Sequence, residues 1–169
     1  MPGTFYVELL DANKHRRDQF ACESPALTEF LHKRARKEMG AKTSVCFVMT
    51  LPQDSSRIAG YYTLSAASIC LTDLPAETIK KLPRYPHLPA TLIGRLARDL
   101  SFRRQGIGPV LLRDAMSRAL LHSREIGSAF LLVDAKDAKA SGFYAQFGFK
   151  PISESRLFIA MKDIQLWLR

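Results

Sequence analysis

A short basic turn with two glycines, Arg103-Arg104-Gln105-Gly106-Ile107-Gly108, joins an apolar run to an amphipathic segment. Glycine lets the backbone turn tightly and come close to a ligand, because it carries no Cβ. A helix that starts directly after such a turn offers unpaired N–H groups and the positive end of its dipole. The turn therefore predicts an α/β chain with a cradle for an anion, beside two guanidinium groups.

The length and composition are those of an ordinary globular domain. The chain has 169 residues, of which 47% are hydrophobic and 24% are charged. This is long enough to bury a core, and the composition argues against long disordered stretches. We expect one domain that spans residues 1–169.

The charge balance is strongly basic. Lys and Arg number 25 against 16 Asp and Glu, which gives a formal net charge of +9. Such an excess favours a polyanionic partner such as RNA, DNA or an acidic protein. A phosphate-rich cofactor together with ordinary surface charge is the alternative explanation.

The cysteines and the absence of a long apolar run both indicate the cytoplasm. Cys22, Cys46 and Cys70 are odd in number and widely spaced, which is typical of reduced thiols. We expect Cys46 and Cys70 in the core. No apolar run reaches transmembrane length, and the first ten residues lack a signal-peptide pattern, so no membrane association is expected.

The N-terminal half alternates strand and helix patterns. A helix is expected from Pro25, with Ser24 as its N-cap and an apolar face of Leu27, Phe30, Leu31 and Ala35. The expected strands are Phe5–Leu10, Val45–Leu51 and Ile58–Ile69. The last two would pair as a hairpin around a turn at Pro52–Ser56.

The C-terminal half continues the same pattern after an insertion at Leu71–Ala90, in which a short helix is expected at Ala76–Leu82. The helix after the glycine turn carries an apolar stripe of Val110, Leu111, Leu112, Ala115, Met116, Ala119 and Leu120, and ends at Gly127. A second helix is expected at Ala138–Phe147, capped by Asp137 and stopped by Gly148. The strands are Thr91–Leu100, a buried central strand at Phe130–Val133, and Leu157–Met161, which closes the sheet.

Three pieces in fixed order carry a family resemblance. They are the Arg103-x-x-Gly106-x-Gly108 turn, the apolar strand after its helix, and Phe143-Tyr144-x-x-Phe147-Gly148-Phe149. Together they resemble the GNAT superfamily of acetyl-CoA-dependent N-acetyltransferases. The resemblance implies an α/β (α+β) fold in which a central mixed, mostly antiparallel sheet is flanked by helices.

The resemblance also implies where acetyl-CoA binds, and it implies no metal ion. Backbone amides of Arg104, Gln105, Gly106, Ile107 and Gly108 would hold the CoA pyrophosphate, with Arg103 alongside. Leu96, Ala97 and Arg98 match the splayed strand whose backbone pairs with the pantetheine arm, although they also fit an ordinary sheet strand. Pro109 departs from the family pattern because it has no N–H, which removes one amide contact and leaves the site otherwise intact.

The resemblance places Tyr144 at the position of the family's general acid. Acetyl transfer from a thioester to an amine releases a thiolate, which a nearby phenol can protonate. A phenol pKa near 10 keeps the donor protonated at neutral pH. The alternative is an aromatic that only packs with Phe143, Phe147 and Phe149, but the hydroxyl favours the catalytic interpretation. Gly142, inside the same helix, either allows close approach of the cofactor or is simply tolerated.

No general base stands out. Glu8, Glu29 and His87 cannot be assigned such a role from the sequence, and each fits a surface position. A free α-amino group has a pKa of about 8. Because an ester on the neighbouring carboxyl lowers this value further, an aminoacyl ester would need little deprotonation.

The N-terminal half sharpens the resemblance. Phe20-x-Cys22-x-x-Pro25-x-Leu27-x-x-Phe30-Leu31, Gly60-Tyr61-Tyr62 and Gly94-Arg95-Leu96-Ala97 resemble the GNAT toxins of bacterial type II toxin–antitoxin modules. This implies that the acceptor is the α-amino group of an aminoacyl-tRNA, so that translation is blocked. It also implies a homodimer, and a ribbon–helix–helix antitoxin that neutralises the enzyme and binds operator DNA.

The basic surplus fits a tRNA substrate, because phosphate contacts supply salt-dependent affinity. We hypothesise a contact surface made by the cluster as a whole rather than by each member. The candidates are Lys33, Arg34, Arg36, Lys37, Lys80, Lys81, Arg84, Arg95 and Arg98.

Two other functions stay open from the sequence. One is a GNAT enzyme that acetylates a polyamine, an antibiotic or a protein lysine, although a cationic small substrate would call for an acidic pocket that the sequence does not indicate. The other is a non-catalytic CoA-binding corepressor. The presence of Gly106, Gly108 and Tyr144 together argues against an inactive enzyme.

Overall fold

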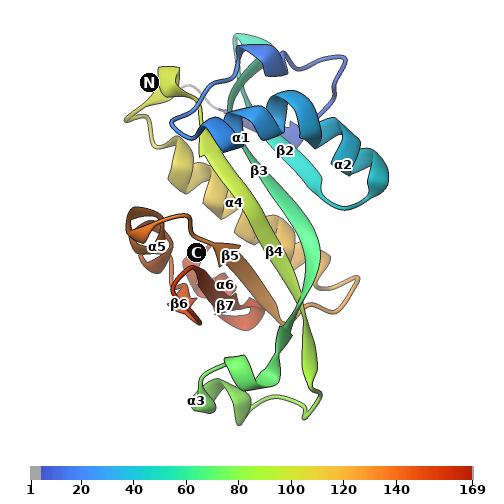
Figure 1. The fold of residues 1–169 in the computed structure, drawn as a ribbon, viewed down its shortest axis with the longest axis vertical. Helices are drawn as coiled ribbons and strands as arrows, with labels where there is room; N and C mark the ends of the chain where they lie inside the picture. Colours follow the sequence, from blue (N-terminus) through green and yellow to red (C-terminus); the bar gives the residue numbers. More distant parts are fainter. Residues whose placement is uncertain (1–4, 169) are drawn as a thin grey trace. The chain divides into compact units, whose positions relative to one another are not determined.

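The computed structural model describes residues 5–168, which form an α+β fold around one seven-stranded sheet (Figure 1). The strands are β1 (Tyr6–Leu9), β2 (Val45–Leu51), β3 (Asp54–Cys70), β4 (His87–Arg98), β5 (Phe130–Asp134), β6 (Lys150–Pro151) and β7 (Arg156–Ala160). The α-helices are α1 (Pro25–Glu29), α2 (Ala35–Ala41), α3 (Ala76–Ile79), α4 (Ile107–His122), α5 (Ala138–Ala145) and α6 (Met161–Trp167). None of the helices in this part of the chain is long and apolar enough to cross a membrane.

The strand order is β1-β2-β3-β4-β5-β7-β6. β1 and β3 both run antiparallel to β2, and β7 runs antiparallel to β5 and β6. β4 and β5 are parallel, with Ala90 opposite Phe130 and Ile93 opposite Val133. The expected mixed, mostly antiparallel sheet is therefore confirmed, and so is β5 as a central strand with a partner on each side.

The chain packs as two compact units. The first unit comprises the residues up to Ser65 together with Gly94–Ala115. The second comprises Ala66–Ile93 and the residues from Met116 onward. β3, β4 and α4 each contribute residues to both units.

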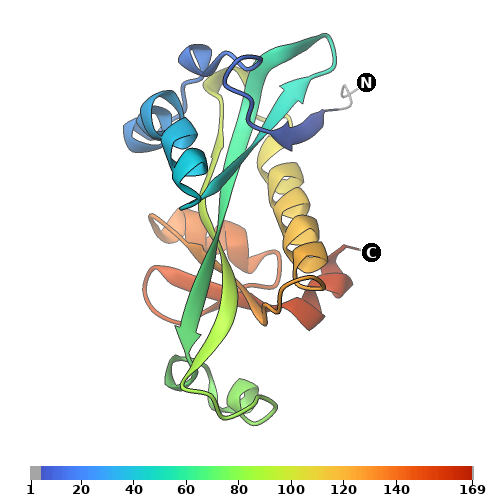
Figure 2. The ribbon, with the colours of Figure 1, turned by 90° about the vertical axis from the view of Figure 1, so that its right-hand side faces the viewer.

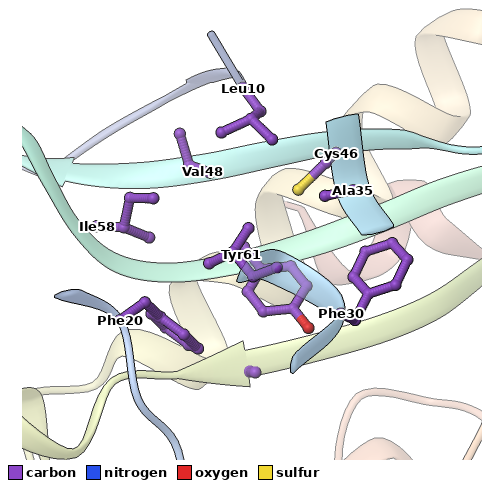
Figure 3. Packing of buried hydrophobic residues seen from close by; sticks show 10 residues of the cluster. Leu10, Phe20, Phe30, Ala35, Cys46, Val48, Ile58 and Tyr61 are labelled. Carbon is purple, nitrogen blue, oxygen red and sulfur yellow. The ribbon is translucent and has the colours of Figure 1, made fainter. Parts of the chain in front are cut away.

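In the first unit, helices cover both faces of the sheet. Figure 2 shows α1 and α2 (blue) on one side of β2 and β3, and the first turns of α4 (yellow) on the other. The core beneath α1 and α2 centres on the Tyr61 ring, which lies edge-on to Phe20 at 5.4 Å and stacked on Phe30 at 6.1 Å (Figure 3). Cys46 is fully buried in this core, as expected.

The first helix begins as expected and then changes its pitch. The Ser24 side chain accepts a hydrogen bond from the Leu27 N–H at 3.3 Å, which confirms the N-cap. Residues Phe30–Arg34 form a π-helix between α1 and α2. Upstream of it, the Tyr61 hydroxyl donates to the Leu27 carbonyl at 2.6 Å. This contact comes from a distant strand, so the helical periodicity of the sequence does not indicate the wider turn.

The second unit carries β5, α5, β7 and α6. The Ala140 N–H donates to Asp137 Oδ1 at 2.8 Å, which confirms Asp137 as the N-cap of α5. α5 ends at Ala145, and Gly148 turns the chain with a φ of +91°. The sequence did not predict β6 or α6, and β7 lies between β5 and β6 rather than at the edge.

Several expectations were wrong in detail. Val110 is 46% exposed, because the inward face of α4 is formed by residues 111, 112, 115, 116 and 119 and position 110 falls beside it. α4 ends at His122 rather than at Gly127. β4 begins at His87 rather than Thr91. Cys70, the last residue of β3, is only partly buried.

Candidate functional site

The glycine turn has the backbone conformation that its sequence demands. A short 3₁₀ helix at Leu100–Phe102 leads into the turn, and α4 begins at Ile107. Gly106 has a φ of +72°, and a Cβ placed on it would meet no atom within 4 Å. Glycine is therefore required here by conformation and not by crowding. Arg104 adopts a φ of +61°, which is uncommon for a residue with a side chain.

The turn presents a row of open amides. The N–H groups of Arg104, Gln105, Gly106, Ile107 and Gly108 donate no hydrogen bond to any group between residues 5 and 168. Unpaired amides at a helix start form a concave anion site. Pro109 adds no donor, as expected. The donor set fits a diphosphate such as that of acetyl-CoA, with the Arg103 side chain exposed next to it.

A glycine in β3 allows α4 to start where it does. Ile107 and Leu111 are fully buried against the sheet. A Cβ built on Gly60 would lie 2.7 Å from Leu111 Cδ1, 3.1 Å from Ile107 Cγ2 and 3.0 Å from the Ala97 carbonyl oxygen. Any larger residue at Gly60 would therefore displace the Leu111 and Ile107 side chains, which anchor the helix start, or the Ala97 carbonyl.

Asp99 fixes the segment that leads into the turn, a role that the sequence analysis missed. Its buried carboxylate accepts hydrogen bonds from the Ser101 N–H at 2.8 Å and the Ala21 N–H at 3.0 Å. Arg57 Nη2 donates to the same carboxylate at 3.3 Å. The Asp-x-Ser sequence was a local signal for the first contact, but Ala21 and Arg57 are far along the chain.

The β4 residues assigned to the pantetheine arm lie in the same unit as the turn. Ala97 is buried, whereas Leu96 and Arg98 are partly exposed. Arg98 Nη2 lies 3.1 Å from Glu23 Oε1, and Arg103 Nε lies 3.6 Å from the same oxygen. The structure therefore brings Arg98 and Arg103 together around a carboxylate that the sequence analysis did not consider.

Tyr144 lies in the second unit, near the end of α5. It is only 7% exposed, and its ring makes edge contacts with Phe143 at 5.2 Å and Phe149 at 5.7 Å. Burial, together with the negative charge of Asp134, raises the pKa of the phenol to about 12. Its hydroxyl forms no hydrogen bond with another residue of 5–168, so it can donate to a ligand. The packing role and the acid role are therefore compatible.

The turn after Tyr144 is covered by the chain's one tryptophan. A Cβ built on Gly148 would collide with Trp167 Nε1 and lie 2.6 Å from Trp167 Cε2. The indole therefore lies directly on the glycine. Met161 and Ile164 are buried and anchor α6, which carries Trp167. Sequence reasoning missed this contact because α6 was not predicted.

The candidate tRNA-contacting residues fall into two groups. Lys33, Arg34, Arg36 and Lys37 are exposed in the first unit, and Lys80, Lys81 and Arg84 are exposed in the second. The Arg95 guanidinium stacks 3.7 Å from the centre of the Phe30 ring, which holds this cation in place. Lys33 pairs with Glu29 at 3.6 Å, and Arg34 pairs with Glu38 at 2.9 Å.

The three residues that sequence reasoning left unassigned all have local contacts. Glu8 accepts hydrogen bonds from Lys14 at 2.7 Å and from His15 at 2.8 Å, and these hold the pKa of its carboxyl below its usual value. Glu29 pairs with Lys33, and His87 Nδ1 lies 3.6 Å from Cys70 Sγ. In residues 5–168, no three His, Cys, Asp or Glu side chains are grouped as a metal site.

Comparisons of the sequence with known proteins identify a family and two relatives. The model of the acetyltransferase (GNAT) domain matches residues 89–162. A probable toxin, TacT, of Sinorhizobium fredii is 30% identical over 168 residues, which cover 94% of this chain and 92% of the relative. A tRNA-acetylating toxin of Mycobacterium tuberculosis is 33% identical over 146 residues and 85% of each chain.

Among solved structures, those of the toxin AtaT are similar to this chain. The structure of AtaT complexed with acetyl-methionyl-tRNAfMet has a TM-score of 0.89 and 29% identity, and covers 98% of this chain and 100% of that one. A mutant AtaT toxin bound to the C-terminus of the antitoxin AtaR and acetyl-CoA has a TM-score of 0.81 and 26% identity, with 96% of each chain covered.

Proposed function

Because the chain belongs to the GNAT acetyltransferases, and within them to the GNAT toxins, we propose that it acetylates the α-amino group of aminoacyl-tRNA. Acetyl-CoA is the acetyl donor, and the acetylated aminoacyl-tRNA no longer serves translation. We also propose that both units act together as one acetyltransferase domain.

The open amides of the glycine turn are the observation that carries this proposal. Five consecutive N–H groups, from Arg104 to Gly108, have no partner among the described residues. A row of donors at a helix start stabilises the charge of a diphosphate through charge-assisted hydrogen bonds. The Arg103 side chain adds a positive charge, and the backbone of Leu96–Arg98 would pair with the pantetheine arm.

The proposed reaction is a direct transfer. The neutral amine nitrogen attacks the thioester carbonyl carbon, a C–N bond forms and the C–S bond breaks. The Tyr144 hydroxyl gives one proton to the departing sulfur, and the proton that the amine loses returns the Tyr144 phenolate to its acid form. A phenol whose pKa lies near 12 stays protonated at neutral pH, so the acid form is always present.

The acceptor amine needs little help from a base. An α-amino group has a pKa of about 8, and esterification of the adjacent carboxyl lowers it. The amine of an aminoacyl ester is therefore largely neutral at physiological pH. This agrees with the local pairing of Glu8, Glu29 and His87, none of which needs to act as a base.

The basic surface supports a tRNA acceptor over a small cationic amine. The net charge is +9, and exposed basic residues lie in two groups, one at positions 33–37 and one just after α3. The main alternative, acetylation of a polyamine or a protein lysine, would favour acidic side chains around the acceptor. The solved structure with an acetylated methionyl-tRNA adds weight to the tRNA acceptor.

The proposed partners follow from the same relatives. A ribbon–helix–helix antitoxin would neutralise the enzyme and carry it to operator DNA, and a homodimer would present two basic surfaces to one tRNA. Light scattering of the purified protein tests the dimer. Both substrates are made and used in the cytoplasm, which is where we place the enzyme.

A pair of tyrosine variants tests the proposed function. Tyr144→Phe removes the hydroxyl and keeps the ring, whereas Tyr85→Phe changes an exposed tyrosine and serves as the control. We expect Tyr144→Phe to bind acetyl-CoA as well as the wild type in calorimetry, and to lose most inhibition of cell-free translation. Full inhibition by Tyr144→Phe would remove this residue from the mechanism. If the wild-type protein does not bind acetyl-CoA in calorimetry, the proposed acetyltransferase activity is wrong.

A further inference from the structure

Two arginines beside the glycine turn share one carboxylate oxygen. Glu23 precedes the N-cap of α1, and its Oε1 lies 3.1 Å from Arg98 Nη2 and 3.6 Å from Arg103 Nε. Arg98 ends β4, and Arg103 opens the turn whose amides are unpaired. Two side chains from different segments therefore converge on a single anion.

The carboxylate leaves this pair of arginines only partly satisfied. Two positive charges face one negative charge. The Nε atom of Arg98 is buried and has no hydrogen-bond partner among the described residues. A guanidinium offers five N–H donors in a planar fork, which suits an anion with more acceptor atoms than one carboxylate oxygen. A phosphate group has such acceptors and more negative charge.

Glu23 is also easy to displace. Its side chain is 51% exposed, and exposed ion pairs contribute little to stability. The Arg57 guanidinium is already paired with Asp99 at 3.3 Å. An anion that approaches Glu23 therefore meets the positive charges of Arg98 and Arg103, which the Glu23 carboxylate partly neutralises.

We propose that Arg98 and Arg103 form a phosphate-binding site in which the Glu23 carboxylate takes the place of the phosphate until the ligand displaces it. Glu23 thereby lowers the affinity of the enzyme for its phosphate-bearing ligand. The inference rests on the proposed function, since both of its substrates carry phosphate: the coenzyme through its diphosphate and 3′-phosphate, and the tRNA through its backbone.

The test is a gain of affinity. Glu23→Gln removes the competing charge and keeps the size of the side chain. Because an exposed ion pair is weak, we expect about a three- to fivefold lower Kd. Glu154→Gln is the matched control, since Glu154 is exposed and forms no ion pair within residues 5–168. It changes the net charge by the same amount and should leave the Kd unchanged.

Three probes identify which phosphate is bound: acetyl-CoA, acetyl-dephospho-CoA, which lacks the 3′-phosphate, and deacylated total tRNA. A gain for acetyl-CoA alone assigns the site to the 3′-phosphate, and an equal gain for both coenzymes assigns it to the diphosphate. A gain for tRNA alone assigns it to the RNA backbone. Any of these results supports the proposal.

A double-mutant cycle separates the site from a general charge effect. In an Arg103→Gln background, Glu23→Gln should give a markedly smaller gain, because one of the two cations it frees is missing. The gain should also shrink at high salt. Equal Kd values for wild type and Glu23→Gln with all three probes, or an equal gain in Glu154→Gln, would overturn the proposal.

The proposal and the proposed function fail in different ways. If the wild-type protein binds none of the three probes, the proposed function fails. If it binds them and the Glu23 and Arg103 variants bind equally well, only this phosphate site is wrong.

Discussion

Gly60 in β3 and Leu111 in α4 are in such close contact that a Cβ on the glycine would lie 2.7 Å from Leu111 Cδ1. This contact places the first turns of α4 against the sheet, and with them the open amides of the glycine turn. The lack of a side chain at Gly60 therefore helps to fix the position of the proposed diphosphate site.

Gly60→Ala should therefore weaken both folding and cofactor binding. Leu111 Cδ1 and the Ala97 carbonyl leave no room for a methyl group, so the side-chain packing under the helix start must change. Overpacking of this kind costs about 1–3 kcal/mol in the free energy of unfolding. We also expect a higher Kd for acetyl-CoA, measured by calorimetry.

Gly40→Ala is the control for this substitution. Gly40 lies in α2 and has open space around its Cα, so alanine should be neutral or add up to about 1 kcal/mol of stability. Urea unfolding of both variants checks the difference. Equal stability of the two variants would show that α4 does not depend on Gly60.

Gly106→Ala should affect the turn through its conformation. A φ of +72° costs a residue with a Cβ about 1–2 kcal/mol, although no atom obstructs the added methyl group. The turn should relax, and the Kd for acetyl-CoA should rise. Gly40→Ala, in α2 with no atom within 4 Å of the added Cβ, is the matched control and should bind acetyl-CoA normally. Unchanged binding by Gly106→Ala would contradict the assigned role of the turn.

Local patterns made much of the fold predictable. The N-caps Ser24 and Asp137, the strand Val45–Leu51 and the glycine turn were all identified, because each depends on residues within a few positions. The central position of β5 also followed from its continuous apolar run.

The remaining features depend on residues that are distant in the sequence. Asp99 accepts hydrogen bonds from Ala21 and Arg57, and no pattern in the sequence indicates these contacts. The π-helix begins three residues after Leu27, whose carbonyl accepts a hydrogen bond from Tyr61 in β3. The same reason explains why the contact of Glu23 with two arginines was not predicted.

Trp167 should matter for the rate of the reaction. Its indole covers Gly148, four residues after the proposed acid Tyr144, so it is a positioning residue for the end of α5. We expect Trp167→Ala to lower kcat by about tenfold, since small displacements of reacting groups are costly. The KM for acetyl-CoA should stay the same, and Trp167→Phe should restore most of the rate.

Leu166→Ala is the control for this experiment, because Leu166 is exposed on the same helix. Its kcat should match that of the wild type. A normal kcat in Trp167→Ala would show that α5 keeps Tyr144 in place without the indole.

The pH profile of the reaction should lack an alkaline decline from Tyr144. Burial raises the pKa of this phenol to about 12, above its ordinary value of 10, so the proton-donating form persists throughout the working range. The rate at low substrate should rise as the amine loses its proton, and then stay level up to about pH 10. A fall with an apparent pKa between about 8 and 9 would assign the acid to another group.

The most direct test of the account follows the acetyl group itself. Purified protein is incubated with acetyl-CoA labelled in its acetyl group and total aminoacyl-tRNA, and the amino acids are then released from the tRNA by mild alkali. We expect labelled N-acetyl-amino acids with the wild type, and almost none with Tyr144→Phe. Wild-type reactions in which no released amino acid carries the label would contradict it.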